Sequence, residues 1–250
     1  MTLRRYLRSF IAHLIKVQTS QVINKSVAQQ SLARYGFSRI ASYSCNKINR
    51  LEFDRLYNFF LTQVSTDGVS VRGETDGIDE GMIDVTDIQR FKLEKSSLNE
   101  LDIISDYVDQ LRHQVEASQM LEHVKFSHSS LYLYKEGFRP RCLHCDTLRS
   151  PHYKVFLYLC EIGADSGPYV LVPGSNKAYI RKTLSLLSNF MFGSDMGQDL
   201  YDMTLFSSSE AIEFTGDVGD VFITDQSAVH GDMPPLDREA FKIILVLNYR

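Results

Sequence analysis

The sequence predicts a mostly β protein with flanking helices, built on a double-stranded β-helix, or jelly roll. After about Phe126 the chain becomes a series of short apolar runs separated by Gly and Pro turns, which is typical of sandwiches and barrels. The number of runs, about eight, suits two facing sheets, and we expect the preceding helices to pack on one of them. The candidate strands are residues 130–135, 141–146, 154–161, 169–173, 210–214, 220–224, 226–230 and 241–249.

At 250 residues, the chain is expected to form a single domain with a substantial core. Residues 28–125 are predicted to be mainly helical support and loops, with helices over 51–62 and after the N-cap candidate Ser97. The Gly-rich and acidic stretch from Ser65 to Gly81 predicts a mobile loop. Residues 126–250 form the predicted jelly-roll core, in which 177–205 is a lid-like insertion containing a helix.

The net charge of −4 hides an asymmetry. Residues 1–50 hold nine Lys/Arg and no acid, which leaves 18 basic against 31 acidic residues, a net charge of −13, for the rest. Residues 1–27 are predicted to form a basic amphipathic helix, which can lie on anionic lipid through residues 1–17, guide import, or pack on the domain. The acidic remainder argues against nucleic-acid binding. No apolar run is long enough to predict a membrane span.

The four cysteines lack the spacing of a disulfide framework, which favours a reducing compartment such as the cytoplasm. Cys142 and Cys145 have the C-x-x-C spacing of a zinc site. A structural zinc site needs four ligands, however, and no second cysteine pair follows.

The stretch RCLHCDTLRSPHY, from Arg141 to Tyr153, holds the strongest chemical signal. If it is a β-strand, His144 and Asp146 point to the same face and can bind a divalent metal from one side. His230 in SAVHGDMPP is the best third ligand. Two histidines and one carboxylate with open coordination positions suit non-haem Fe(II) oxygen chemistry.

Five segments in order carry a resemblance to a known family: LYLYKEG, LHCD, KVFLYL followed by SGPYVLVPGSN, GDVGDVFITDQSAVHG, and FKIILVLNY. Together they resemble the phytanoyl-CoA dioxygenase family of Fe(II)- and 2-oxoglutarate-dependent oxygenases. The resemblance implies that His144, Asp146 and His230 bind Fe(II), with 2-oxoglutarate and O2 as cosubstrates. It implies hydroxylation of a small organic molecule, with release of succinate and CO2. Asp146 argues against the halogenating relatives, which have a small residue there.

The family also has an arginine that anchors the far carboxylate of 2-oxoglutarate. Its place falls on Lys242, and Arg238 is the second candidate. A lysine supplies the charge but not the two-pronged hydrogen bonds of arginine. The family often has Ser or Thr where this chain has Asp232, and the aromatic wall of the cosubstrate pocket maps onto Phe156, which simple core packing would explain nearly as well.

Lys242 and Asp232 keep a second hypothesis open, a non-catalytic jelly-roll module that binds a metal or ligand without turnover. A cupin-like metal hydrolase or isomerase is a third. Arg149, His152, Arg181 and Lys182 can meet an anionic substrate, although solvated surface charge explains each of them as well. The sequence predicts neither the substrate nor the oligomeric state.

Overall fold

The computed structural model describes residues 27–40, 42–63, 69–72, 82–86, 88, 99–121, 123–135, 138, 142–148, 151–192, 202–237 and 239–250. The predicted N-terminal helix over residues 1–27 lies outside them except for Val27, so it stays a prediction. No helix in these ranges combines the length and apolar character needed to span a bilayer.

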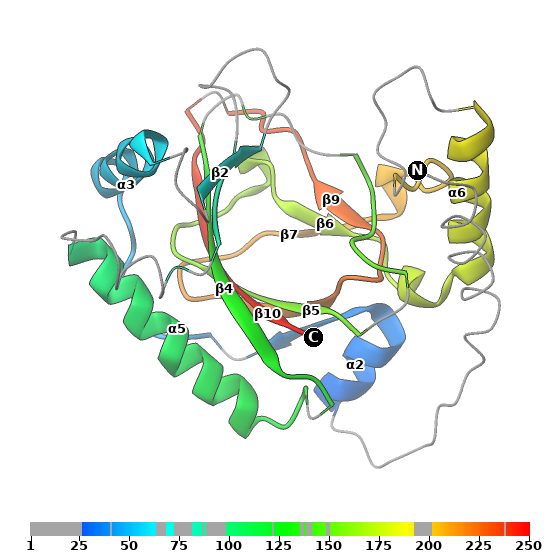
Figure 1. The fold of residues 1–250 in the computed structure, drawn as a ribbon, viewed down its shortest axis with the longest axis horizontal. Coiled ribbons are helices and arrows are strands. Elements are labelled where there is room, and N and C mark those ends of the chain that lie inside the picture. The colour runs from blue at the N-terminus through cyan, green and yellow to red at the C-terminus, as the bar shows by residue number, and fades with distance from the viewer. Residues whose placement is uncertain are drawn as a thin grey trace.

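The described strands form two antiparallel sheets (Figure 1), which confirms the predicted fold class. The large sheet has the order β1-β8-β5-β10-β4-β3-β2, and the small sheet has the order β7-β6-β9. The strands are β1 (Phe37–Ile40), β2 (Val69–Arg72), β3 (Met82–Thr86), β4 (Phe126–Tyr134), β5 (Tyr153–Tyr158), β6 (Tyr169–Leu171), β7 (Ile212–Phe214), β8 (Val221–Asp225), β9 (His230–Asp232) and β10 (Lys242–Tyr249).

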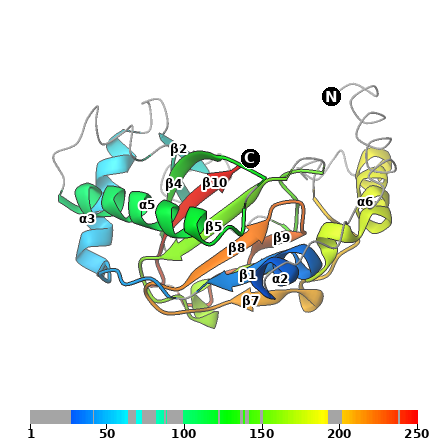
Figure 2. The ribbon, with the colours of Figure 1, turned by 90° about the horizontal axis from the view of Figure 1, so that it is seen from below.

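Four helices of the described part surround the sheets: α2 (Val27–Tyr35), α3 (Arg50–Thr62), α5 (Asn99–Ala117) and α6 (Tyr179–Phe192). In Figure 1, α3 and α5 lie beside the large sheet on the side away from β6, β7 and β9. Figure 2 shows α2 beside β1, and α6 at the far end of the molecule from α3 and α5.

The central strand β10 explains why the sequence FKIILVLNY is almost continuously apolar. Every residue from Lys242 to Tyr249 is buried. Alternate side chains of a strand point to opposite faces, and here one face meets the layer containing α5 while the other faces the small sheet. A strand covered on both faces has no solvent side on which polar residues would be required.

Several sequence predictions were wrong in detail. Residues 142–148 form no strand, although His144 makes isolated bridges to Asp202 and His230. Residues 226–229 form a turn, and the strand begins only at His230. The predicted loop from Ser65 to Gly81 contains β2. Residues 28–125 contribute three strands to the large sheet, where mainly helices and loops were expected.

Gly219 forms the turn that leads into β8. Its φ of +90° lies in the left-handed region that favours glycine. A Cβ built on it would lie 2.0 Å from the backbone oxygen of Tyr43. The turn therefore packs against the segment after β1 so closely that only glycine fits.

The start of α3 provides a test of local helix stability. The Asn49 side chain accepts a hydrogen bond from the Glu52 backbone N–H (3.1 Å), and the Glu52 carboxylate accepts one from the Asn49 N–H (2.8 Å). This capping box satisfies two amide groups that a helix leaves without partners at its first turn.

We predict that Asn49→Ala lowers the free energy of unfolding by about 1 kcal/mol, since it removes the cap. Urea denaturation measures the change. The control is Asn58→Ala, at an exposed position within the same helix, where the change is expected to stay within about 0.5 kcal/mol. Equal losses for the two variants would show that the capping box contributes nothing specific.

Candidate metal centre

His144 and His230 are held side by side by their own backbones. The N–H of each donates to the carbonyl of the other, and both hydrogen bonds are 2.8 Å long. His230 is the first residue of β9 in the small sheet, whereas His144 lies in the segment between β4 and β5. The paired backbones bring the two imidazole rings to a centroid distance of 4.5 Å.

Both imidazoles are oriented by the same local contact. Nδ1 of His144 lies 2.8 Å from the carbonyl oxygen of Cys142, and Nδ1 of His230 lies 2.9 Å from that of Ala228. A carbonyl only accepts, so each Nδ1 carries the proton and donates it. In a neutral ring Nε2 is then the nitrogen with a free lone pair, and this arrangement is common around metal-binding histidines.

Asp146 completes the group. Its Oδ1 lies 3.5 Å from Nε2 of His144 and 3.8 Å from Nε2 of His230. The side chain of Asp146 is 22% exposed, compared with 9% and 4% for the two histidines, so the group is open on the aspartate side. One ligand atom from each residue lies within 4.8 Å of the other two.

The electrostatics favour the protonation states that metal binding requires. Burial lowers the pKa of His230 to about 3, with a further contribution from His144, so its ring is neutral near pH 7. Burial by itself raises the pKa of the Asp146 carboxyl, but Lys154 and the two histidines outweigh it and hold that pKa well below its usual range. Neutral imidazoles and an ionised carboxylate are the forms that ligate metals.

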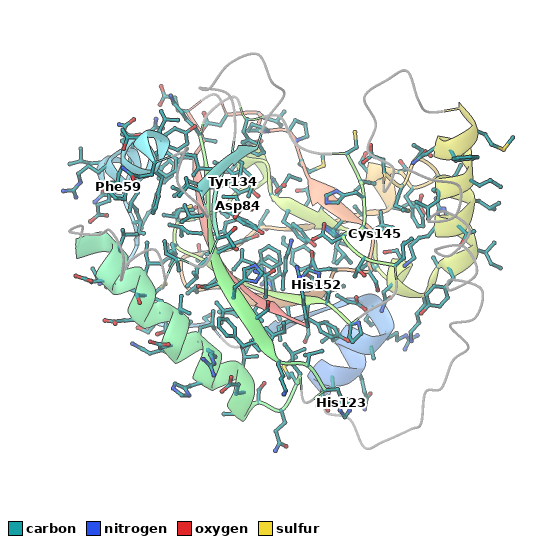
Figure 3. The ribbon with its side chains drawn as sticks, viewed as in Figure 1. Phe59, Asp84, His123, Tyr134, Cys145 and His152 are labelled. Atoms are coloured by element: carbon teal, nitrogen blue, oxygen red, sulfur yellow. The ribbon has the colours of Figure 1, made fainter. Side chains whose placement is uncertain are left out.

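This donor set fits a divalent ion of the Fe(II) type, because it has two nitrogen donors, one carboxylate oxygen and an accessible side. The group includes neither Cys142, which is exposed, nor Cys145, which is buried. The residues therefore give no support to the alternative of a zinc site based on the C-x-x-C pair. Figure 3 labels Cys145, which lies between His144 and Asp146 in the sequence, and His152, on the segment that leads into β5.

Lys154 lies on the far side of Asp146, a contact that the sequence analysis missed. Its Nζ donates to Oδ2 of Asp146 at 2.7 Å. The available signal was its position in YKVFLYL, because Lys154 and Phe156 are two residues apart on β5 and so face the same side.

Lys242 is fully buried, and Asp232 neutralises it. Its Nζ donates to Oδ1 of Asp232 at 3.0 Å and to the carbonyl of Gly167 at 2.5 Å. The ammonium also lies 4.0 Å from the ring centroid of Tyr134, a residue labelled in Figure 3. Burial lowers the pKa of Lys242, and the opposing effect of Asp232 compensates in part.

Phe156 lies between the two sheets, in an aromatic cluster that reaches the histidines. Its ring stacks on Phe222 at 4.8 Å and contacts Tyr169 at 5.0 Å. Tyr169 in turn stacks on the ring of His230 at 5.5 Å. Tyr169 is therefore a second site residue that the sequence did not predict. Phe156 contacts Tyr169 and reaches the candidate metal centre through this contact.

The remaining candidates do not gather at the metal centre. Arg238 and Arg149 lie outside the described residues. Lys182 is not a solvated surface charge, because it is fully buried and donates to the backbone carbonyl of Ser227 at 2.7 Å. Arg181 forms a half-exposed ion pair with Glu210. His152 is buried, and its ring nitrogen lies 3.5 Å from the amide oxygen of Asn248.

Three solved structures illustrate what the chain resembles. The non-heme alpha ketoglutarate dependent carbocyclase SnoK from nogalamycin biosynthesis is 14% identical (TM-score 0.56), and the match covers 90% of this chain and 84% of SnoK. EctD from S. alaskensis, solved with bound Fe, is 15% identical (TM-score 0.55; coverage 93% and 80%). EvdO2 from Micromonospora carbonacea var. aurantiaca, solved with 2-oxoglutarate, is 13% identical (TM-score 0.52; coverage 91% of both chains).

These proteins share the fold of this chain. Identities at this level show the fold alone. No protein-family model matches the chain, and a search of curated proteins found no match. Membership of the phytanoyl-CoA dioxygenase family therefore stays a prediction.

The buried pair of Lys242 and Asp232 gives a stability prediction. Lys242→Met leaves a carboxylate without its cation, and breaking a wholly buried pair in this way costs about 3–5 kcal/mol. We expect a smaller loss, because the Asp232 side chain keeps 18% exposure. Adding Asp232→Asn should restore part of the loss, which urea denaturation of the single and double variants measures.

The matched control for this experiment is Lys47→Met, which breaks an ion pair with Glu161 whose side chains are 60% and 68% exposed. Exposed pairs contribute about 0–1 kcal/mol. If Lys242→Met costs no more than this control, the buried pair does not stabilise the fold.

Proposed function

We propose that the protein is an Fe(II)- and 2-oxoglutarate-dependent dioxygenase, similar to the phytanoyl-CoA dioxygenase family, that hydroxylates a small organic substrate. The observation that carries the proposal is the convergence of two imidazoles and one carboxylate, held ionised by its neighbours, on one point. The shared fold with enzymes described as alpha ketoglutarate dependent or solved with Fe supports it. The proposal treats residues 1–250 as a single oxygenase domain.

In this proposal His144, Asp146 and His230 hold the metal. Bound Fe(II), with O2 and 2-oxoglutarate, supplies the oxidant that inserts oxygen into a C–H bond, while 2-oxoglutarate becomes succinate and CO2. The backbone contacts at Nδ1 keep both Nε2 atoms turned towards the ion. The ring of Tyr169 covers the ring of His230, and Phe156 packs against Tyr169, so apolar rings shield His230 from bulk water.

Lys242 is the proposed anchor for the far carboxylate of 2-oxoglutarate, with Arg238 as the alternative. An ammonium with no exposed surface gains from any anion that reaches it, because the surrounding dielectric is low. Asp232 already neutralises it, however. Binding of the dicarboxylate therefore requires Asp232 to share Lys242 or to move away from it.

The proposed substrate is a small organic molecule. Of the four residues considered for an anionic substrate, Lys182 and Arg181 already have partners, and His152 is buried. All four cysteines are free thiols, which suits the cytoplasmic location included in the proposal.

The first test uses the metal ligands. We predict that purified protein releases succinate from 2-oxoglutarate in an Fe(II)-dependent manner. His144→Ala and Asp146→Ala should each reduce the rate by more than about 100-fold, since even changes in residues behind the ligands cost 10–100-fold. The control is His113→Ala on α5, at an exposed position, which should retain the full rate. Substantial succinate release from the ligand variants would contradict the proposed site.

The ion pair of Lys242 with Asp232 specifically favours a second candidate, a metal-binding module that has lost turnover. Anaerobic titration of 2-oxoglutarate into the Fe(II)-loaded protein separates the two. We predict a visible charge-transfer band that saturates with 2-oxoglutarate, because the cosubstrate would bind iron through its keto and carboxylate oxygens. If the protein binds Fe(II) but shows no such band at any 2-oxoglutarate concentration, the result supports the metal-binding module and contradicts the dioxygenase.

A further inference from the structure

The two carboxylate oxygens of Asp146 have different neighbours. Oδ1 faces the Nε2 atoms of His144 and His230, at 3.5 and 3.8 Å. Oδ2 accepts a charge-assisted hydrogen bond from Nζ of Lys154 at 2.7 Å, a distance typical of the stronger class of such bonds. One oxygen thus points to the metal position and the other is already bound to a cation.

We propose that Lys154 is a positioning residue that holds Asp146 as a one-oxygen ligand, with Oδ1 turned to the metal and Oδ2 kept away from it. This inference rests on the proposed function, because it assumes a metal between the three side chains.

The segment that carries Asp146 explains why such a residue is needed. Residues 142–148 form no strand, so no hydrogen-bonded ladder fixes the direction of the Asp146 side chain. Its backbone N–H makes a single hydrogen bond, to the carbonyl of Gln226 at 3.1 Å. The side chain is therefore oriented by what it contacts at its tip.

Lys154 provides a rigid base for that contact. It lies on β5 within the large sheet, opposite Asn248 on one side and Thr224 on the other. Its side chain is only 14% exposed. Because β5 is hydrogen-bonded on both edges, the sheet fixes the backbone from which the Lys154 side chain starts.

The difference between one-oxygen and two-oxygen binding decides how much of the coordination sphere is open. An ion held by one atom from each of the three residues would keep open positions for 2-oxoglutarate and O2. A carboxylate that bound through both oxygens would occupy one of these. By holding Oδ2, Lys154 keeps the position open, which is a role that a merely stabilising ion pair would not have.

The test compares two variants at this position. Lys154→Met keeps the length of the side chain but removes the donor, and Lys154→Arg keeps a donor. Each metal-free variant is first shown to be folded by urea denaturation. Fe(II) and Co(II) affinities are then measured by equilibrium titration. The number of oxygen and nitrogen neighbours of Fe(II) is measured by X-ray absorption, with and without 2-oxoglutarate.

For Lys154→Met we expect a 10- to 100-fold loss of metal affinity, the range found for residues that orient metal ligands, and a change in the carboxylate coordination of the iron. Lys154→Arg, which keeps a donor, should bind metal more tightly than Lys154→Met. Lys47→Met, at an exposed lysine, is the charge-matched control and should bind metal like the parent.

The proposal is overturned if Lys154→Met, while folded, has the parent's metal affinity and coordination. It is also overturned if its affinity rises, because repulsion between Lys154 and the metal would then outweigh positioning. The metal readouts need no turnover, so a parent protein that binds metal but not 2-oxoglutarate refutes the proposed function alone. A parent protein that binds no metal refutes both.

Discussion

The candidate metal centre depends on two backbone hydrogen bonds, those exchanged between His144 and His230. They join a segment without regular structure to the small sheet and place two imidazoles at a fixed separation. The other contacts at the site orient two imidazoles whose separation the main chain has already fixed. Because the bonds involve no side-chain atoms, substitution of either histidine removes a ligand without removing the bridge.

A second constraint is electrostatic. The space between the sheets contains two lysines, Lys154 and Lys242, each bound to a carboxylate. Such pairs are costly to bury and add little stability over apolar residues of the same size. In the proposed function, one of these pairs includes the metal ligand Asp146 and the other contains the proposed 2-oxoglutarate anchor Lys242. A divalent cation and a dicarboxylate together would leave the net charge of the interior unchanged.

The sequence predicted the fold class, and it predicted β4, β5, β8 and β10 because these strands are apolar runs between clear turns. It missed β1, β2 and β3, which are four, four and five residues long. Their place in the sheet is defined by their partner strands more than by their own residues. The three candidate ligands do converge, although the argument from a strand at 141–146 was wrong, since the backbone bends there. The burial of Lys182 had no signal in the sequence, because its partner is a backbone carbonyl 45 residues away.

Lys182 and Lys242 are fully buried, so chemical labelling of their side chains can report local opening of the structure. One fixes the start of α6 to the turn before His230, and the other fixes the start of β10 to the end of β9. An amine-reactive reagent reaches the exposed lysines at once but reaches these two only when the layers separate. The labelling rate of Lys182 would therefore measure how often the contact between α6 and the turn before His230 opens. The labelling rate of Lys242 would measure the same for the contact between β10 and β9.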